Sequence, residues 1–310
     1  MARKDGIDTF GAVSLVVFSL VLAVNQVAIK ITNDGLQPIF AAGLRSLLAV
    51  VFVGLWIGLR GGRVRPDPAY LGPGLLVGAA FTVEFVCLFL ALDLTTVTRA
   101  AIIFYSMPLW LALAAHLLIP GERIGRGKAL GLVLAFAGVA WVLSDRGAGG
   151  QGSLWGDLLA LGAALSWGGI ALCARLTRLR ELKPEAQLFW QVSVSAVALL
   201  ALAPLFGPLL RDLQPVHLVS LLFQAGVVVS AGFMFWFWLL TVYPAAAVAS
   251  FSFLSPVFSV ALGAFWLGEP VGATVIGALA LVALGLWLIN RPARVARAAP
   301  GALPPDPRDI

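Results

Sequence analysis

Charged side chains are scarce in this chain. Only 12% of its 310 residues are Asp, Glu, Lys or Arg, against roughly 25% in an ordinary soluble domain, and 60% are hydrophobic. A soluble fold of this length could not bury so much apolar surface, and the mean hydropathy is +0.97. These values predict a polytopic membrane protein.

Cysteine and histidine are also scarce, which excludes several kinds of chemistry. Cys87 and Cys173 lie in separate apolar stretches, so the sequence predicts neither a disulfide framework nor a zinc cluster. His116 and His217 have no acidic or nucleophilic neighbours at catalytic spacing, and no P-loop, GxSxG or HExxH motif occurs. We therefore expect no metal, no cofactor and no enzymatic activity.

Long uncharged stretches set the expected fold. Residues 213–268 carry no charge over 56 positions, more than twice the roughly 20 residues that span a bilayer as a helix. The turn signal Tyr243-Pro244 divides this stretch into two spans. Backbone groups in lipid require helices, so we predict an all-α integral membrane fold of ten transmembrane helices. The expected spans are residues 10–32, 38–59, 72–92, 95–119, 128–144, 153–175, 184–205, 216–240, 245–267 and 271–290.

Basic residues are distributed unevenly over the expected loops. With the N-terminus in the cytoplasm, 16 basic residues lie on the inner side and four on the outer side. This asymmetry predicts a multi-pass protein with cytoplasmic N- and C-termini, in the bacterial inner membrane. The net charge of +6 then follows from topology and from contact with anionic lipid, so no nucleic-acid partner is expected.

The two halves of the chain repeat. Phe10 to Thr32 overlays Trp155 to Thr177 at an offset of 145 residues, and Pro108 matches Pro256 at 148. Five spans per half reverse the direction of the second half, so we expect two inverted five-helix repeats. The expected divisions are a cytoplasmic N-terminus at 1–9, repeats at 10–144 and 153–290, a glycine-rich joint at 145–152 and a cytoplasmic tail at 291–310.

Short motifs at equivalent places in the halves resemble a known family. They are Ala91-Leu92, Thr95, Ala100-Ala101, Pro108 and Gly121-Glu122, and in the second copy Pro244-Ala245-Ala246-Ala247, Ser255-Pro256 and Gly268-Glu269. This pattern resembles the EamA-type repeat of the drug/metabolite transporter superfamily. The resemblance implies a central cavity lined by spans 1, 3, 4, 6, 8 and 9, with spans 5 and 10 at the periphery. It also implies export of amino acids or other metabolites, and the aromatic-rich spans favour the aromatic amino-acid exporters.

Two charges, Arg45 and Glu84, lie deep inside spans, and charge in lipid is costly enough to indicate function. Both are expected roughly 10 to 12 Å below the outer boundary, at the level of Asn25, so Arg45 and Glu84 can meet. One interpretation is an ion pair that only joins helices. The other gives Glu84 and Asn25 the polar end of a substrate, with Glu84 able to take a proton.

Prolines and aromatic residues complete the candidate site. Pro108 and Pro256 remove a backbone donor in equivalent spans, so we expect either gating kinks or fixed kinks. Flat apolar walls suit an aromatic or thioether substrate and attract ammonium groups. The expected wall residues are Phe81, Phe85, Tyr105, Trp167, Trp238 and Phe253.

The remaining charged and small residues receive structural roles. Gly268-Glu269 should end a helix and tether the next element, and Asp93 and Arg99 should pair across the surface turn between spans 3 and 4. Glycines of spans 5 and 10 are available either for a homodimer or for packing within one chain.

The function that these features favour is secondary export of a small molecule, with amino acids as the leading class and no ATP site visible. The alternatives are a lipid or drug flippase of the same fold, a channel and a membrane-embedded enzyme. No paired intramembrane carboxylates, GxGD motif or ring of charge favours the last two.

Overall fold

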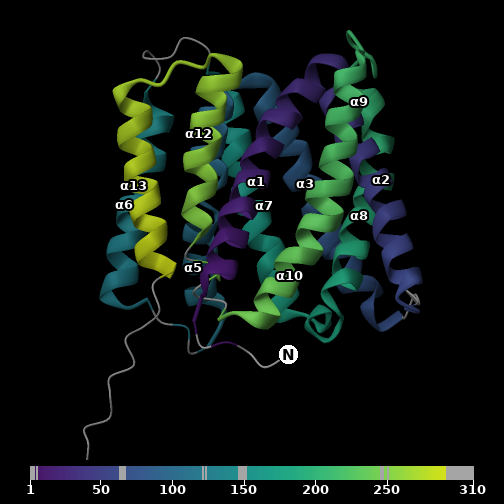
Figure 1. Cartoon of the computed structure of the whole chain (residues 1–310), viewed down its shortest axis with the longest axis horizontal. Helices are drawn as coiled ribbons and strands as arrows, with labels where there is room; N and C mark the ends of the chain where they lie inside the picture. Colours follow the sequence, from purple (N-terminus) through teal and green to yellow (C-terminus); the bar gives the residue numbers. More distant parts are fainter. Residues whose placement is uncertain are drawn as a thin grey trace, which may run out of the picture.

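The computed structural model describes residues 4, 6–62, 68–120, 122, 124–145, 152–244, 248–249 and 251–290. Nine apolar helices in this part of the chain are long enough to cross a membrane, and a shorter one covers Phe251–Leu267 (Figure 1). The predicted ten-helix fold is confirmed. The expected start of the ninth span at 245, most of the 145–152 joint and the 291–310 tail lie outside the described residues.

The helices follow the expected spans closely. In the first half they are α1 (Thr9–Gly35), α2 (Pro38–Leu59), α3 (Pro68–Leu94), α4 (Val97–Phe104), α5 (Met107–Leu118) and α6 (Arg126–Ser144). In the second half they are α7 (Leu154–Leu176), η1 (Arg178–Glu181), α8 (Pro184–Leu202), η2 (Ala203–Phe206), α9 (Pro215–Leu222), η3 (Phe223–Gly232), α10 (Phe233–Val242), η4 (Phe251–Phe253), α12 (Leu254–Leu267) and α13 (Ala273–Asn290).

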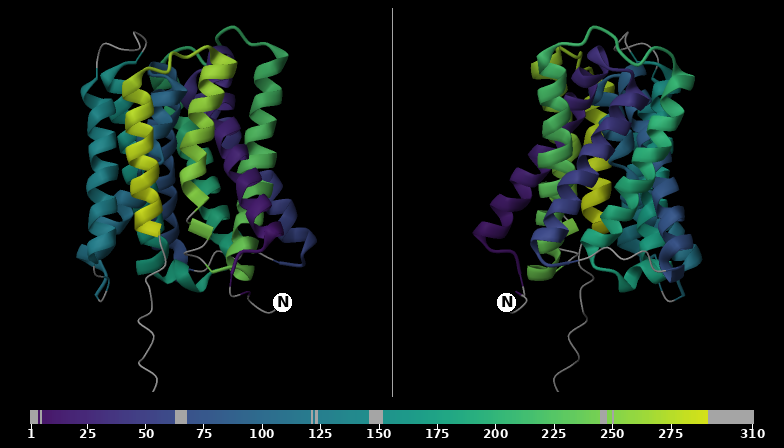
Figure 2. Two further views of the ribbon diagram at one scale, coloured as in Figure 1. Left: turned by 60° about the vertical axis from the view of Figure 1, so that its left-hand side comes forward. Right: turned by 90° about the vertical axis from the view of Figure 1, so that its right-hand side faces the viewer.

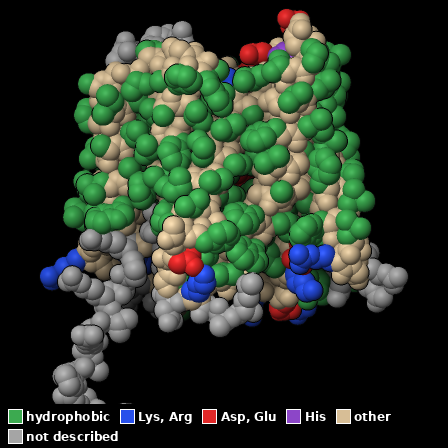
Figure 3. All heavy atoms as spheres, viewed as in Figure 1, with side chains coloured by type: hydrophobic (Ala, Val, Ile, Leu, Met, Phe, Trp, Pro, Cys, Tyr) green, Lys and Arg blue, Asp and Glu red, His purple; other side chains and the backbone are tan. Residues whose placement is uncertain are grey.

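The two ends of the bundle have to be distinguished. Both views of Figure 2 place the start of α1 and the end of α13 at the same end. We call the end that carries Thr9 and Asn290 the terminal side, and the end that carries Gly35 and Ala273 the far side. Large apolar side chains cover the middle of the face in Figure 3, while charged side chains gather near the two ends. This distribution matches a bundle surrounded by lipid.

Local chemistry sets most helix boundaries. Pro38, Pro184 and Pro215 each begin a helix, where the missing N–H costs nothing. Asp8 caps α1 by accepting a hydrogen bond from the Gly11 backbone N–H at 2.9 Å. Gly268 ends α12 in the left-handed conformation, with a φ of 65°. Punctuation in the sequence was therefore a good guide to the spans.

The fourth span is interrupted next to Pro108. α4 ends at Phe104 and α5 begins at Met107, and Ser106 Oγ donates to the Ile103 carbonyl at 2.6 Å beside the break. Pro108 stands in the first turn of α5. In the ninth span, Pro256 stands third in α12, directly after the 3-10 turn η4. Pro108 thus lies just after a break between two α-helices, and Pro256 just after a change from 3-10 to α-helix.

The eighth span contains an irregularity that the sequence did not predict. Between α9 and α10, the ten residues Phe223–Gly232 form a π-helix. Within it, Ser230 Oγ donates to the Ala225 carbonyl at 2.7 Å. A π-helix widens the turn and shifts the faces of the residues that follow. The uniformly apolar sequence of this span gives no periodic signal of such a change.

Glycines bring the fifth and tenth spans together. A Cβ on Gly131 would lie 2.7 Å from the Gly285 carbonyl oxygen, and a Cβ on Gly138 would lie 2.7 Å from the Ala278 carbonyl oxygen. A Cβ on Gly277 would lie 2.7 Å from the ring of Trp141 on α6. Of the two roles considered for these small residues, the structure shows packing of α6 on α13 within one chain.

Candidate functional site

Buried polar side chains gather at mid-depth in α1, α2 and α3. Asn25, Arg45 and Glu84 are 8%, 1% and 4% exposed. α1 and α3 run in the same direction, and Asn33 Nδ2 donates to the Phe89 carbonyl at 2.9 Å between them. Counting back from this bond at about 1.5 Å per residue places Asn25 and Glu84 within about one helical turn of each other in depth.

Arg45 is held by aromatic faces. Its guanidinium carbon lies 3.6 Å from the ring centroid of Phe85 and 5.2 Å from that of Phe89, both on α3. This is cation–π geometry, which attracts the charge without using its N–H groups. The buried Nε and Nη2 atoms of Arg45 have no hydrogen-bond partner.

The expected direct ion pair between Arg45 and Glu84 is not formed in this structure. The ion pairs of the described residues join Lys4 with Asp8, Arg99 with Asp157, Arg175 with Glu122 and Arg211 with Asp93. Arg45 stacks instead on Phe85, the residue that follows Glu84 in the chain.

Aromatic side chains from the fourth and sixth spans meet beside α1. Trp167 of α7 stacks on Phe104 at 4.9 Å between ring centroids and meets Tyr105 edge-on at 6.4 Å. The Tyr105 hydroxyl donates to the Leu22 carbonyl of α1 at 3.2 Å. On α3, Phe81 and Phe85 form an edge-to-face pair at 4.5 Å. The structure thus forms two aromatic pairs from the expected wall residues.

Two expected wall residues lie apart from these pairs. Trp238, toward the terminal side of α10, is 37% exposed, stacks on Phe235 and meets Phe10 edge-on at 6.2 Å. Phe253, in η4, is partly buried against the main apolar core. The π-helix earlier in the eighth span sets the direction of Trp238, so its helical register was not predictable from sequence.

Buried amides form a further group, of which the sequence predicted only Asn25 as a site residue. The side-chain carbonyl oxygens of Asn25, Gln26, Asn33 and Gln224 are all buried without a hydrogen-bond donor. The available signal was the presence of Gln26, Asn33 and Gln224 inside apolar spans, where unpaired amides are costly. Gln224 Nε2 donates to Thr32 Oγ1 at 2.8 Å, which connects the π-helix to α1.

On the far side, one carboxylate joins the fourth and ninth spans. Glu269 accepts hydrogen bonds from the backbone N–H groups of Val97 and Thr98 at 2.7 and 2.8 Å, and from Thr98 Oγ1 at 2.6 Å. An anion is stabilised at a helix N-terminus, and Glu269 is only 6% exposed. The expected tether is therefore a carboxylate that follows α12 and caps α4.

Ion pairs add to the connections on the far side, with partners other than those expected. Arg99 pairs with the buried Asp157 of α7, with Nη2 and Oδ2 2.5 Å apart. Asp93 pairs with Arg211, with Oδ1 and Nη1 2.6 Å apart. The expected surface pair of Asp93 with Arg99 is therefore wrong, because segments distant in sequence supply a closer partner for each.

The central spans are less tightly packed toward the terminal side. Seven of the eight residues of α4 are buried, but only Leu109 and Ala115 are buried among the twelve of α5. In the eighth span, η3 has five buried residues and α10 has two, Leu239 and Val242. The fourth and eighth spans thus pass from a tightly packed half into a loosely packed half.

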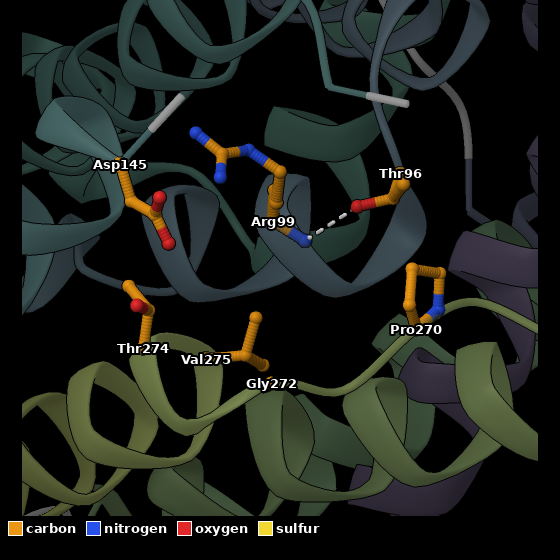
Figure 4. Close-up of a pocket in the computed structure, with 7 residues that line it drawn as sticks. All are labelled: Thr96, Arg99, Asp145, Pro270, Gly272, Thr274 and Val275. Atoms are coloured by element: carbon orange, nitrogen blue, oxygen red, sulfur yellow. Dashed lines mark hydrogen bonds between the residues drawn. The ribbon is translucent and has the colours of Figure 1, made fainter. Parts of the chain in front are cut away.

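A small pocket lies on the far side, away from the buried polar group (Figure 4). Its lining side chains come from the start of α4, the end of α6 and the segment that leads into α13. In Figure 4 the backbone N–H of Arg99 donates to Thr96 Oγ1, at 3.2 Å. The lining contains none of the predicted site residues, so this pocket is not the expected central cavity. The lining residues are Thr96, Arg99, Asp145, Pro270, Gly272, Thr274 and Val275.

The chain is similar to known transporters. Residues 9–144 and 154–291 each match the EamA-like transporter family. The chain is 29% identical over 317 residues to a Salmonella typhimurium protein named "Probable amino-acid metabolite efflux pump", covering 95% of this chain and 99% of that protein. It is also 29% identical over 205 residues to the "Uncharacterized transporter YvbV" of Bacillus subtilis, covering 64% of this chain and 65% of that protein, just under two thirds.

The fold has a counterpart among solved structures. One crystal structure, 19% identical in sequence, superposes with a TM-score of 0.62. The match covers 90% of this chain and 95% of that chain. At this level of identity the likeness concerns the fold alone.

Proposed function

Since this chain belongs to the EamA-like transporter family, we propose that it exports amino acids, or other amphipathic metabolites, as a secondary transporter that works by alternating access. The family makes the chain a membrane transporter of a small molecule rather than an enzyme. The observation that carries the proposal is the buried group of Asn25, Arg45 and Glu84 beside aromatic rings inside a two-repeat bundle. A similar protein with the printed name of an amino-acid metabolite efflux pump supports the substrate class.

The substrate site in this proposal lies where the tight and loose halves of the central spans meet. Asn25 and Glu84 hold the polar end of the substrate, while Phe81 and Phe85 form one wall. Tyr105 and Trp167 form a second wall across α1. Phe253 and Trp238, which lie toward the terminal side, border the path of entry.

Alternating access uses the two inverted repeats, 10–144 and 153–290, as the moving units. The break beside Pro108 separates the tight and loose halves of the fourth span, and Pro256 lies at the equivalent place in the ninth span, just after η4, so we assign these prolines to gating. In the conformation described here the far side is closed by the hydrogen bonds of Glu269 to the start of α4 and by the ion pairs of Arg99 with Asp157 and of Arg211 with Asp93. The terminal side faces the bacterial cytoplasm, as the distribution of basic residues indicates.

Counterflow in proteoliposomes tests the proposal. Purified protein is reconstituted with unlabelled phenylalanine inside, and uptake of labelled phenylalanine, methionine and leucine is followed with and without an imposed pH gradient. We expect saturable exchange that Glu84→Gln lowers by at least about tenfold, because a buried charged contact contributes about 1.5–3 kcal/mol. Glu181→Gln, on an exposed carboxylate that accepts a bond from the Tyr70 hydroxyl, is the matched control and should exchange normally.

Two results would contradict the proposal in different ways. Absence of exchange for every amino acid, with transbilayer movement of labelled phospholipid instead, would replace amino-acid export by lipid flipping in the same fold. Normal exchange and normal pH dependence in Glu84→Gln would remove Glu84 from the site while leaving the transport function standing.

A further inference from the structure

Arg45 is a charged side chain with unused hydrogen-bonding capacity in the middle of the bundle. It is 1% exposed, and its Nε and Nη2 atoms have no hydrogen-bond partner. Leaving buried charged donors unpaired costs free energy unless something compensates. Stacking on Phe85 at 3.6 Å attracts the cation through its face, but it leaves the edge of the guanidinium, where the N–H groups lie, unsatisfied.

A purely structural role does not account for this side chain. A guanidinium that locks helices together should form a bidentate pair with a carboxylate, as Arg99 does through Nε to Oδ1 and Nη2 to Oδ2 of Asp157. No described carboxylate stands in that position for Arg45. The equivalent position of the second repeat is Gln191, so the repeat architecture does not require a cation there.

The same region contains unpaired acceptors. The side-chain oxygens of Asn25 and Gln26 are buried without a donor. Glu84 is 4% exposed, and its carboxylate takes part in none of the ion pairs among the described residues. The Tyr105 hydroxyl donates to the Leu22 carbonyl, one helical turn before Gln26 on α1, and so links this group to the aromatic wall. Unused donors and unused acceptors therefore occupy one level of the bundle.

An α-amino acid carries the complement of this arrangement. Its carboxylate offers lone pairs to the planar fork of a guanidinium, and its ammonium offers three N–H donors to a carboxylate and an amide oxygen. Arg45 and Glu84 carry opposite charges, so a zwitterion adds no net charge to the buried site. A simple amine or a simple acid would leave one of the two protein charges unpaired.

We propose that Arg45 binds the α-carboxylate of the substrate while Glu84 and Asn25 bind its ammonium, so that the site selects zwitterions. This inference rests on the proposed function and specifies its substrate class. Phe85 contributes by holding the guanidinium plane from one side, which leaves the N–H edge directed for a bidentate contact. Arg45 is then a specificity-determining residue.

Binding of paired probes to purified protein tests the inference. L-Phenylalanine and 2-phenylethylamine share the ring and the ammonium, but only phenylalanine has a carboxylate. Wild type should bind phenylalanine at least about tenfold more tightly. Arg45→Gln should weaken phenylalanine binding by at least about tenfold and change phenylethylamine binding by less than about threefold.

Two further variants keep the test decisive. Arg45→Lys retains the charge but loses the planar fork, so it should weaken phenylalanine binding alone, even where Arg45→Gln does not fold. Arg60→Gln is the matched control, since Arg60 follows the same helix and stacks on Trp56 at 4.4 Å but is exposed. Its binding of both probes should equal that of wild type.

The outcomes separate this inference from the proposed function. Equal losses for phenylalanine and phenylethylamine in the Arg45 variants would make Arg45 structural and overturn the inference. Retained preference for phenylalanine in Arg45→Gln would do the same while leaving amino-acid transport intact. Failure of wild type to bind any amino acid would overturn the proposed function together with the inference.

Discussion

The two ends of the bundle differ in how the central spans are held. On the far side, Glu269 caps α4, Arg99 pairs with Asp157, and almost all of α4 is buried. On the terminal side, the equivalent Gly-Glu motif supplies Glu122, which pairs with Arg175 at the exposed surface, and α5 is mostly unburied. The two Gly-Glu motifs thus make a buried helix cap through Glu269 at one end, called here the latch, and an exposed ion pair through Glu122 at the other. Such asymmetry is expected of a transporter caught with one end closed.

The largest effect on stability is expected from removing a buried charge on the far side. Arg99→Gln leaves the carboxylate of Asp157, which is 1% exposed, without its cation. Breaking a buried pair in this way should lower the free energy of unfolding by about 3 kcal/mol. Thermal unfolding in detergent, read by intrinsic tryptophan fluorescence, gives the change in stability.

Arg211→Gln is the control for that variant. Arg211 and its partner Asp93 are 40% and 21% exposed, so the loss should stay under about 1 kcal/mol. Equal losses in Arg99→Gln and Arg211→Gln would show that burial does not distinguish the two far-side pairs.

A second test asks whether the weaker packing seen in α5 and α10 is confined to those helices or extends to the contact of α6 with α13. A Cβ on Gly285 would lie 2.6 Å from the Gly131 carbonyl oxygen, a backbone atom that cannot easily move. Gly285→Ala should therefore destabilise the protein by about 2 kcal/mol through forced separation of α6 and α13. Gly58→Ala, where nothing lies within 4 Å, should not destabilise it. Similar unfolding temperatures for Gly285→Ala and wild type would show that α6 and α13 are also weakly packed against each other.

The two Gly-Glu motifs give a third, smaller test. Glu269→Gln removes a charge-assisted cap from α4 and should weaken far-side closure by about 1.4 kcal/mol, or about tenfold in the closed-to-open ratio. Labelling of a single cysteine at Val97, a buried residue that donates to Glu269 through its backbone N–H, by a membrane-impermeant thiol reagent, with Cys87 and Cys173 replaced by alanine, measures that ratio. Glu122→Gln should leave the labelling unchanged, and equal effects of the two variants would remove the distinction between latch and surface contact.

The smallest effect concerns the hydrogen bonds of Asp8 that hold the start of α1 to the end of α10, called here the Asp8 tether. Lys4, Tyr243 and the Gly11 N–H all donate to Asp8 and hold the pKa of its carboxyl below the ordinary value of 3.8. Because the folded-state pKa is depressed, the tether contributes fully above about pH 4 and is lost as the pH falls through the lower, folded-state value. Amide exchange at Gly11, corrected for its intrinsic pH dependence, should show constant protection from pH 7 to pH 5.

Tyr243→Phe removes one of those donors, so the pKa of Asp8 should rise toward its ordinary value and protection should fail at a higher pH than in wild type. An unchanged pH dependence in Tyr243→Phe would show that the hydroxyl of Tyr243 does not hold the N-terminus to α10.

Sequence reasoning predicted the spans because prolines, glycines and charges punctuate them. The expected seventh span at 184–205, for example, corresponds to Pro184–Phe206 in the structure. The ion-pair partners of side chains were harder to predict, because the partners of Arg99 and Asp93 come from segments 58 and 118 residues away. Local sequence cannot choose among such distant loops.

The candidate site shows the same limit. Burial of Arg45 and Glu84 followed from their positions in apolar spans, but the stacking of Arg45 on Phe85 depends on how α2 meets α3. The π-helix in the eighth span was invisible because its sequence is apolar at every turn, and it changed where Trp238 lies. Tertiary packing, rather than the residues themselves, decided these details.

A disulfide across the far side tests alternating access most directly. An ideal Cβ at Gly263 of α12 lies 2.9 Å from Thr98 Oγ1 of α4, which is within reach of a disulfide once Glu269 Oε2, 2.7 Å from that Cβ, moves aside. Thr98→Cys with Gly263→Cys, without Cys87 and Cys173, should form the bond, stop phenylalanine counterflow when oxidised and recover it when reduced. Each single cysteine should be insensitive to oxidation. If the oxidised protein, with its disulfide intact, showed counterflow as fast as the protein after reduction of the disulfide, this would contradict a mechanism in which the fourth and ninth spans must separate.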